Sequence, residues 1–217
     1  MTGTFIFDLD GTLSDTIPII VMSTRGAMAE LGISGVSDEQ IISCIGMPLT
    51  DTGELFLGAG RGREYADKYM EYFDRCPLRP RAFDGIPELL QRLRDDGHTL
   101  CIATSKRDRA AFSTLHDIGV YDYFSVIVTC ENCPDHKPGP GPALKAMELS
   151  RSAPERSIFV GDSLYDFYCA RAAGIACCAV SYGACSGEAL AAAGAELVAD
   201  SVAELRQILL DFAARID

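Results

Sequence analysis

Residues 4–16 read TFIFDLDGTLSDT, a short apolar run that leads into two aspartates and a glycine. The run Thr4–Leu9 is typical of a strand buried on both faces. Side chains two positions apart on a strand point the same way, so Asp8 and Asp10 can face one site. Because two adjacent carboxylates repel one another, the pair is costly unless a cation intervenes or one is protonated. Taken alone, an Asp-Gly turn after a strand would explain the same residues.

The pattern becomes helical from Thr16 to about Arg79, with no convincing strand. Apolar residues recur at helical spacing, and Ser37 with Gln40 forms a capping-box signature. A third helix is predicted at Leu49–Leu57, and a fourth carries a stripe of aromatic residues at Tyr65, Tyr69, Tyr72 and Phe73.

After Pro80, short apolar runs alternate with helical patterns. The runs predict strands at His98–Thr104, Phe124–Thr129, Ser157–Val160, Ile175–Ser181 and Glu196–Ala199. Strands that alternate with helices indicate βαβ units and a parallel sheet covered on both faces. We therefore predict an α/β fold with a doubly wound parallel sheet, formed by residues 1–15 and 80–217. Residues 16–79 are predicted to be an inserted helical domain.

Three further polar clusters follow predicted strands, where sites form in such sheets. Thr104-Ser105-Lys106 could hold a phosphate, although a helix N-cap would need the same residues. Lys137 lies in a loop, where a lysine is usually a solvated charge. Asp162 could ligate Mg²⁺ and Asp166 could support that ligand set, although an aspartate there can also cap a helix. Together the clusters offer a nucleophile, an acid/base, phosphate donors, a cation and a Mg²⁺ site.

The chain resembles the haloacid dehalogenase superfamily of phosphohydrolases. The matching motifs are FDLDGTLSDT at Phe7–Thr16, TSK at Thr104–Lys106, KP at Lys137-Pro138 and GDSLYD at Gly161–Asp166. The resemblance covers essentially the whole chain and implies a Rossmann-like core with a helical cap. The runs Ile45–Leu49 and Phe83–Leu90 resemble the branch that contains phosphoglycolate phosphatases and 5'-nucleotidase-like enzymes.

The resemblance implies a role for each of these residues. Asp8 would attack phosphorus, and Asp10 would act as the general acid and base. Mg²⁺ would be held by Asp8, the backbone carbonyl of Asp10 and Asp162, with Asp166 supporting the metal shell and Lys137. The expected phosphate-binding residues are Gly11, Thr104, Ser105 and Lys137, and the expected cap contacts to substrate are Thr16, Arg25 and Met47.

The expected activity is Mg²⁺-dependent hydrolysis of a small phosphomonoester, with phosphoglycolate favoured. A 5'-nucleotidase and an inorganic pyrophosphatase are the alternatives. A β-phosphoglucomutase-like mutase is disfavoured because residues 16–79 contain no histidine. A dehalogenase attacks carbon and releases halide, so it needs no acid for an alcohol leaving group. A phosphonatase of this family forms a Schiff base with a cap lysine, and it is disfavoured because the only lysine of residues 16–79 is Lys68, within the helix that carries the aromatic stripe. A phosphoacceptor regulatory domain is the non-enzymatic alternative, but it has no use for a cap.

Composition restricts the partners and the compartment. The 217 residues carry 31 Asp and Glu against 19 Lys and Arg, which argues against a nucleic-acid or anionic-membrane surface. The nine cysteines are expected to be reduced thiols in a cytoplasmic protein. No signal peptide or membrane span is readable. The expected partner is a small phosphorylated metabolite, and the protein is expected to be a monomer or homodimer.

One short pattern remains outside this scheme. Cys130, Cys133 and His136 have spacings that could belong to a zinc site, but a structural site needs four ligands. A plain loop is the favoured interpretation. The Gly-Pro run that follows Lys137 is expected to stiffen this loop.

Overall fold

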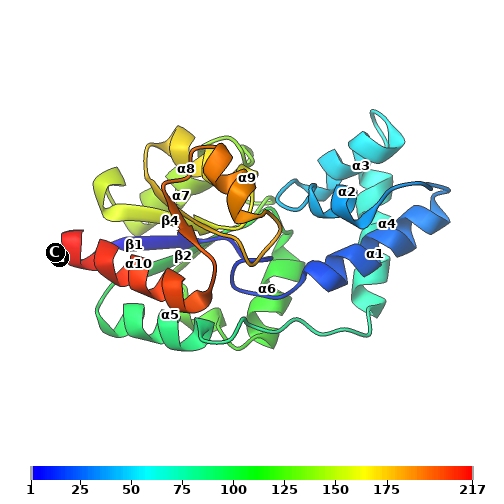
Figure 1. Cartoon of the computed structure of the whole chain (residues 1–217). Helices are drawn as coiled ribbons and strands as arrows, with labels where there is room; N and C mark the ends of the chain where they lie inside the picture. The colour runs from blue at the N-terminus through cyan, green and yellow to red at the C-terminus, as the bar shows by residue number, and fades with distance from the viewer. Residues whose placement is uncertain (1, 217) are drawn as a thin grey trace.

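A computed structural model of the chain describes residues 2–216. Its core is a parallel sheet of six strands in the order β3-β2-β1-β4-β5-β6 (Figure 1). The strands are β1 (Thr4–Phe7), β2 (Thr99–Ala103), β3 (Val126–Val128), β4 (Ser157–Gly161), β5 (Ala176–Val180) and β6 (Leu197–Ala199). The strand order reverses between β1 and β4, which makes their carboxyl ends the natural place for a site. The α/β doubly wound prediction is confirmed.

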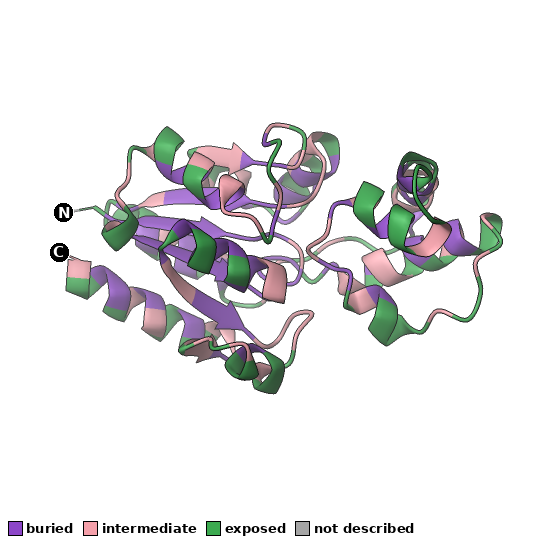
Figure 2. Ribbon diagram, turned by 90° about the horizontal axis from the view of Figure 1, so that it is seen from above, coloured by how far each residue is buried: buried purple, intermediate pink, exposed green. Residues whose placement is uncertain are grey.

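Helices cover both faces of the sheet, because side chains along each strand alternate between the faces. Phe5 and Phe7 pack into one apolar cluster with side chains of α5, α6 and α10, whereas Ile6 packs into another with α7 and α8. Figure 2 shows the buried residues concentrated on the strands between these layers. The core helices are α5 (Ile86–Asp95), α6 (Asp108–Asp117), α7 (Gly141–Ser150), α8 (Leu164–Ala173), α9 (Gly187–Ala192) and α10 (Val202–Ile216).

A block of four helices lies beside the carboxyl ends of the strands, between β1 and α5 in the chain (Figure 1). Its helices are α1 (Ile17–Glu30), α2 (Asp38–Ile42), α3 (Leu49–Leu57) and α4 (Gly62–Arg75). The buried side chains of Tyr65 and Tyr69 form its own small core with Met28 and Ile41. The capping box predicted at Ser37 and Gln40 is present at the start of α2.

The two segments that join this block to the sheet domain pair with each other. Ser14 and Ala82 form an antiparallel bridge, flanked by hydrogen bonds from the Asp15 amide to the Arg81 carbonyl and from the Phe83 amide to the Leu13 carbonyl. The entry and exit of the block are therefore fastened together at one point.

No helix among residues 2–216 is both long enough and apolar enough to span a bilayer.

Candidate active site

The predicted site residues Asp8, Thr104 and Asp162 follow β1, β2 and β4, three adjacent strands of the sheet. All three side chains are buried. The parallel arrangement therefore brings together, at one edge of the sheet, residues that are up to 154 positions apart in the chain.

Lys137 joins two of the acidic residues. Its Nζ donates to Asp8 Oδ1 at 2.7 Å and to Asp166 Oδ1 at 2.6 Å, and the lysine side chain is 1% exposed. Burial lowers the pKa of Lys137, but the charges of Asp166 and Asp8 outweigh burial and raise it above the usual value. Lys137 is thus a permanent cation at the centre of the site.

Asp162 is oriented by neighbours from two loops. Its Oδ1 accepts from the Thr12 hydroxyl at 3.0 Å, and its Oδ2 accepts from the Ala184 amide at 2.7 Å. Gly11 and Gly183 flank it so closely that a Cβ on either would lie within 2.4 Å of the carboxylate oxygen Oδ2. Both positions therefore require glycine for Asp162 to occupy this place.

Three carboxylates converge as a candidate metal centre. Asp8, Asp162 and Asp166 each offer an oxygen within 4.8 Å of the others, and all three are buried. Burial, opposed by Lys137 and reinforced by Asp166 and Asp10, raises the pKa of Asp8 from 3.8 to about 7. Burial and the charges of Asp8 and Asp166 raise the pKa of Asp162 well above its usual value. A divalent cation would relieve this accumulated repulsion, and oxygen donors suit Mg²⁺.

The Asp10 side chain lies outside this triad. Its Oδ1 accepts from the Thr16 hydroxyl at 2.6 Å and from Lys106 Nζ at 2.7 Å. No hydrogen bond reaches Asp10 Oδ2 from any residue that the structure describes, so this oxygen is available to another group. Thr16 is fully buried and does not line the cavity. The Thr16 hydroxyl holds Asp10, so the structure gives Thr16 a position behind the cavity wall rather than on it.

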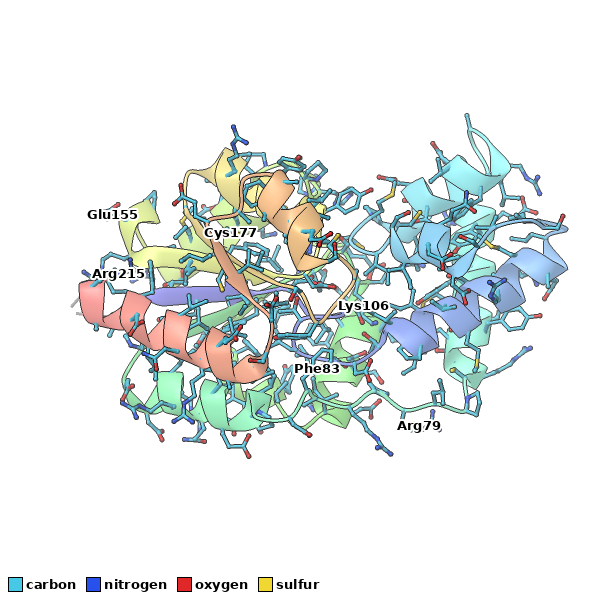
Figure 3. All side chains as sticks on the ribbon, in the orientation of Figure 1. Arg79, Phe83, Lys106, Glu155, Cys177 and Arg215 are labelled. Atoms are coloured by element: carbon cyan, nitrogen blue, oxygen red, sulfur yellow. The ribbon has the colours of Figure 1, made fainter. Side chains whose placement is uncertain are left out.

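The sequence places Lys106 in the Thr104-Ser105-Lys106 cluster but assigns it no role of its own. Besides pairing with Asp10, its Nζ lies 4.8 Å from the centre of the Phe73 ring on α4, a cation–π contact. Figure 3 shows Lys106 at the junction between the sheet domain and the helical block. Its position in the TSK motif is the signal that could have identified it.

The predicted phosphate-binding residues have different environments. Thr104 is buried, lines the cavity, and accepts a hydrogen bond from the Lys106 amide at its hydroxyl oxygen, which leaves its proton free to donate. The Ser105 hydroxyl instead donates to the Gly46 carbonyl at 2.5 Å. The Gly11 amide donates to the Ser14 carbonyl at 2.9 Å. The Gly11 amide is therefore not free to bind phosphate, and this glycine makes room for Asp162.

A cavity that is partly open to solvent extends from Asp8, Asp10 and Thr104 into the helical block. Met47 lines it, as expected. Arg25 does not line it: the arginine is exposed on α1 and pairs with Asp38 at 2.5 Å. Helical periodicity does not show which face of α1 covers the sheet domain, so the sequence alone could not place Arg25.

The cysteine-containing loop has another explanation. Among residues 2–216, the only group of three or more metal-binding side chains is the aspartate triad, so Cys130, Cys133 and His136 do not converge on an ion. Asp135 accepts from the Gly141 amide at 2.7 Å, and a Cβ at Gly139 or Gly141 would lie 2.5 Å from the Asp135 side chain. The glycines after Lys137 therefore accommodate Asp135 rather than simply stiffening the loop.

Comparison with known proteins agrees with this arrangement. The family model described as haloacid dehalogenase-like hydrolase matches residues 5–180, which is most of the chain. The chain belongs to the haloacid dehalogenase-like hydrolases. The resemblance inferred from the four motifs is thereby confirmed.

Relatives of this haloacid dehalogenase-like hydrolase include named phosphatases. The phosphoglycolate phosphatase of Thiobacillus denitrificans is 35% identical over 209 residues, covering 92% of each chain. PpaX of Caldanaerobacter subterraneus subsp. tengcongensis, a provisionally assigned pyrophosphatase, is 34% identical over 184 residues, covering 82% of this chain and 80% of its own. The crystal structure of a predicted phosphatase from Clostridium acetobutylicum superimposes with a TM-score of 0.87 at 27% identity, covering 97% of this chain and 99% of that one.

Proposed function

We propose that this hydrolase is a Mg²⁺-dependent phosphatase that cleaves small phosphomonoesters through an aspartyl-phosphate on Asp8. The observation that carries the proposal is the orientation of Asp8. Lys137 holds its Oδ1, while no described residue hydrogen-bonds to its Oδ2, and Asp8 lines the cavity. One oxygen of a buried carboxylate is thus fixed by a cation and the other remains available for attack.

In the first step, Asp8 Oδ2 forms a bond to phosphorus as the bond to the ester oxygen breaks. Asp10, in its protonated form, gives its proton to the departing alcohol oxygen. Thr104 and Lys137 would stabilise the charge on the phosphoryl oxygens, because both groups are fixed before the substrate arrives.

In the second step, a water molecule attacks the phosphorus of the aspartyl-phosphate. Asp10, now ionised, accepts a proton from this water, and Asp8 leaves as a carboxylate. Thr16 and Lys106 keep Asp10 in place through its Oδ1, so Oδ2 would carry the proton in both steps.

Asp8, Asp162 and the backbone carbonyl of Asp10 would hold the Mg²⁺, with Asp166 supporting them. The ion would screen the repulsion between the Asp8 carboxylate and the phosphate dianion. The buried and mutually repelling triad supports this proposal. Residues 16–79 would form a cap that excludes water from the cavity.

Phosphoglycolate and pyrophosphate are the first substrates to test, because the relatives are named for them. Steady release of p-nitrophenol from p-nitrophenyl phosphate over many turnovers, with Mg²⁺, is the result expected of a phosphatase. A single stoichiometric release would instead support the phosphoacceptor alternative.

A further inference from the structure

The walls of the cavity differ sharply between its two sides. The sheet domain contributes the charged residues Asp8, Asp10, Lys106 and Arg107. The structure describes all of residues 16–79, and none of their charged side chains lines the cavity. The helical block instead contributes a largely apolar wall that includes Ile20, Ile41, Met47, Leu49, Phe56 and Met70.

Aromatic rings form a continuous part of this wall along α4. Tyr65 and Tyr69 have ring centres 6.4 Å apart, and Tyr69 and Phe73 stack with centres 6.0 Å apart at an angle of 24°. Phe56 on α3 adds a fourth ring, 6.3 Å from Tyr65. The helical spacing of four residues places the three α4 rings on one face, so they meet the cavity as a ladder.

Most polar groups on this wall already have partners. The Tyr65 hydroxyl donates to Thr24, the Thr52 hydroxyl donates to the Pro48 carbonyl, and the Cys44 thiol donates to the Gln40 carbonyl. Tyr69 is the exception. It is 5% exposed, lines the cavity, and its hydroxyl has no hydrogen-bond partner among the described residues.

The Tyr69 hydroxyl is therefore a spare donor near the reacting groups. Burial, and then the charge of nearby Asp10, raise the pKa of this phenol well above its usual value, so the hydroxyl keeps its proton. This donor faces the cavity and can bind an acceptor atom of the ligand, such as an ester or ether oxygen, so the wall does not need a charged substrate group to use it.

The cations of the cavity are already paired. Lys106 is bound to Asp10 and to the Phe73 ring, and Arg107 pairs with Glu131 at 3.0 Å. A second negative charge on the substrate would therefore lie against apolar side chains and near Asp10, without a free cation to receive it. Placing an unpaired charge in such surroundings is strongly unfavourable.

We propose, on the basis of the phosphatase function proposed above, that the cavity selects phosphomonoesters whose alcohol portion is uncharged and apolar or aromatic. The phosphoryl group would lie at Asp8 and Thr104, and the alcohol portion would pack against the ladder of Tyr65, Tyr69 and Phe73. A carboxylate or second phosphate on the alcohol would reduce binding.

The test compares esters of similar shape. Isobutyl phosphate has nearly the shape of 2-phosphoglycolate, with two methyl groups in place of the two carboxylate oxygens. We expect kcat/KM, measured as phosphate release with saturating Mg²⁺, to be at least about tenfold higher for isobutyl phosphate. Across methyl, ethyl, propyl and butyl phosphate, kcat/KM should rise by up to about fourfold for each methylene group.

Two variants test whether the cavity wall formed by the helical block sets this selectivity. Met47→Arg places a cation in the wall and should shift the ratio of kcat/KM values at least about tenfold toward 2-phosphoglycolate. Leu55→Arg is the matched control, since Leu55 is 61% exposed on α3 and does not line the cavity, and it should leave the ratio unchanged.

Equal or faster hydrolysis of 2-phosphoglycolate by the unmodified enzyme would overturn this selectivity and leave the phosphatase proposal intact. The same conclusion would follow if p-nitrophenyl phosphate were turned over and none of the alkyl esters were. Failure to turn over any ester, p-nitrophenyl phosphate included, would overturn both proposals.

Discussion

Lys137 Nζ lies 2.7 Å from Asp8 Oδ1, and the side chains of both residues are almost completely buried. The contact joins the first strand end to a loop 129 positions later in the chain. It places a fixed positive charge beside the proposed nucleophile, and the same charge would meet the phosphoryl oxygens of a substrate.

Replacing the nucleophile should stop the reaction without unfolding the protein. Asp8→Asn keeps the shape of the side chain and its acceptor oxygen for Lys137, but an amide is a poor nucleophile. We expect phosphate release to fall by at least about a thousandfold. Asp15→Asn is the control, because Asp15 is exposed on the same loop. Residual activity within about tenfold of the unmodified enzyme would show that Asp8 is not the nucleophile.

Asp10→Asn should slow the second step, the attack of water on the aspartyl-phosphate, more than the first. Nitrophenolate is a good leaving group and needs little protonation, so Asp8 can still be phosphorylated by p-nitrophenyl phosphate. The attacking water, in contrast, loses its base. We therefore expect a burst of about one nitrophenol per active site, followed by slow turnover. Stopped-flow absorbance measures the burst, and slow turnover without a burst would contradict this role for Asp10.

The local pattern of residues was enough to predict the six strands, the helical block and the acidic site. Each strand is a short apolar run with its polar residues at the carboxyl end, so the parallel topology brings Asp8, Thr104 and Asp162 together. These predictions depend only on periodicity and on residues next to one another in the chain.

Contacts between distant segments could not be predicted in this way. Lys106 reaches Asp10 across 96 positions, and Ser105 reaches Gly46 across 59. The contact of Ser105 with Gly46 depends on how the helical block is placed against the sheet domain, and the pair of Lys106 with Asp10 depends on the direction of a loop side chain. No local pattern records either. The same reason explains why the sequence does not show that Arg25 lies outside the cavity or that the Tyr69 hydroxyl faces it.

Mg²⁺ should stabilise the folded protein, because the three buried carboxylates repel one another when no cation is bound. At a Mg²⁺ concentration one hundred times the dissociation constant, the free energy of unfolding should rise by about 2.7 kcal/mol. Differential scanning calorimetry with EDTA and with Mg²⁺ measures the shift in Tm, and EDTA should also abolish phosphate release. Asp162→Asn should lose most of the shift, and an unchanged shift in this variant would exclude Asp162 as a ligand.

Without metal, the stability of the protein should depend on the ionisation of Asp8. Its pKa is raised in the folded state from 3.8 to about 7, so between these values the folded protein holds a proton that the unfolded chain has released. This contribution to stability is complete below about pH 4 and is lost as the pH rises through about 7. The loss is on the order of 4 kcal/mol.

Asp8→Asn removes the titration of Asp8, since the amide does not titrate, together with the charge by which Asp8 raises the pKa of Asp162. In EDTA, the free energy of unfolding of the unmodified protein minus that of the variant should fall from about pH 4 to pH 7 and then level off. Urea unfolding at a series of pH values gives both quantities. A constant difference across this range would show that the pKa of Asp8 is not raised.

The loop at Gly46 should control how the helical block meets the active site. Gly46 has a φ of +103°, and a Cβ there would lie 2.8 Å from the Tyr165 ring and 2.9 Å from the Ser163 hydroxyl. Gly46→Ala must therefore push the loop away from α8, disturbing the bond between the Gly46 carbonyl and Ser105 and displacing Met47 from the cavity wall. We expect kcat/KM for phosphomonoesters to fall at least about tenfold.

Gly35→Ala is the matched control for this substitution. Gly35 also has a positive φ, of +79°, but nothing lies within 4 Å of the added Cβ. Both variants should lose about 1 kcal/mol of stability from backbone strain, whereas only Gly46→Ala should lose activity. Phosphate release is measured at a temperature where thermal melting shows that the two variants are folded to the same extent. This separates the loss of stability from the loss of activity. If both variants lost activity equally, the loss would reflect strain in the helical block rather than the contact between Gly46 and the sheet domain.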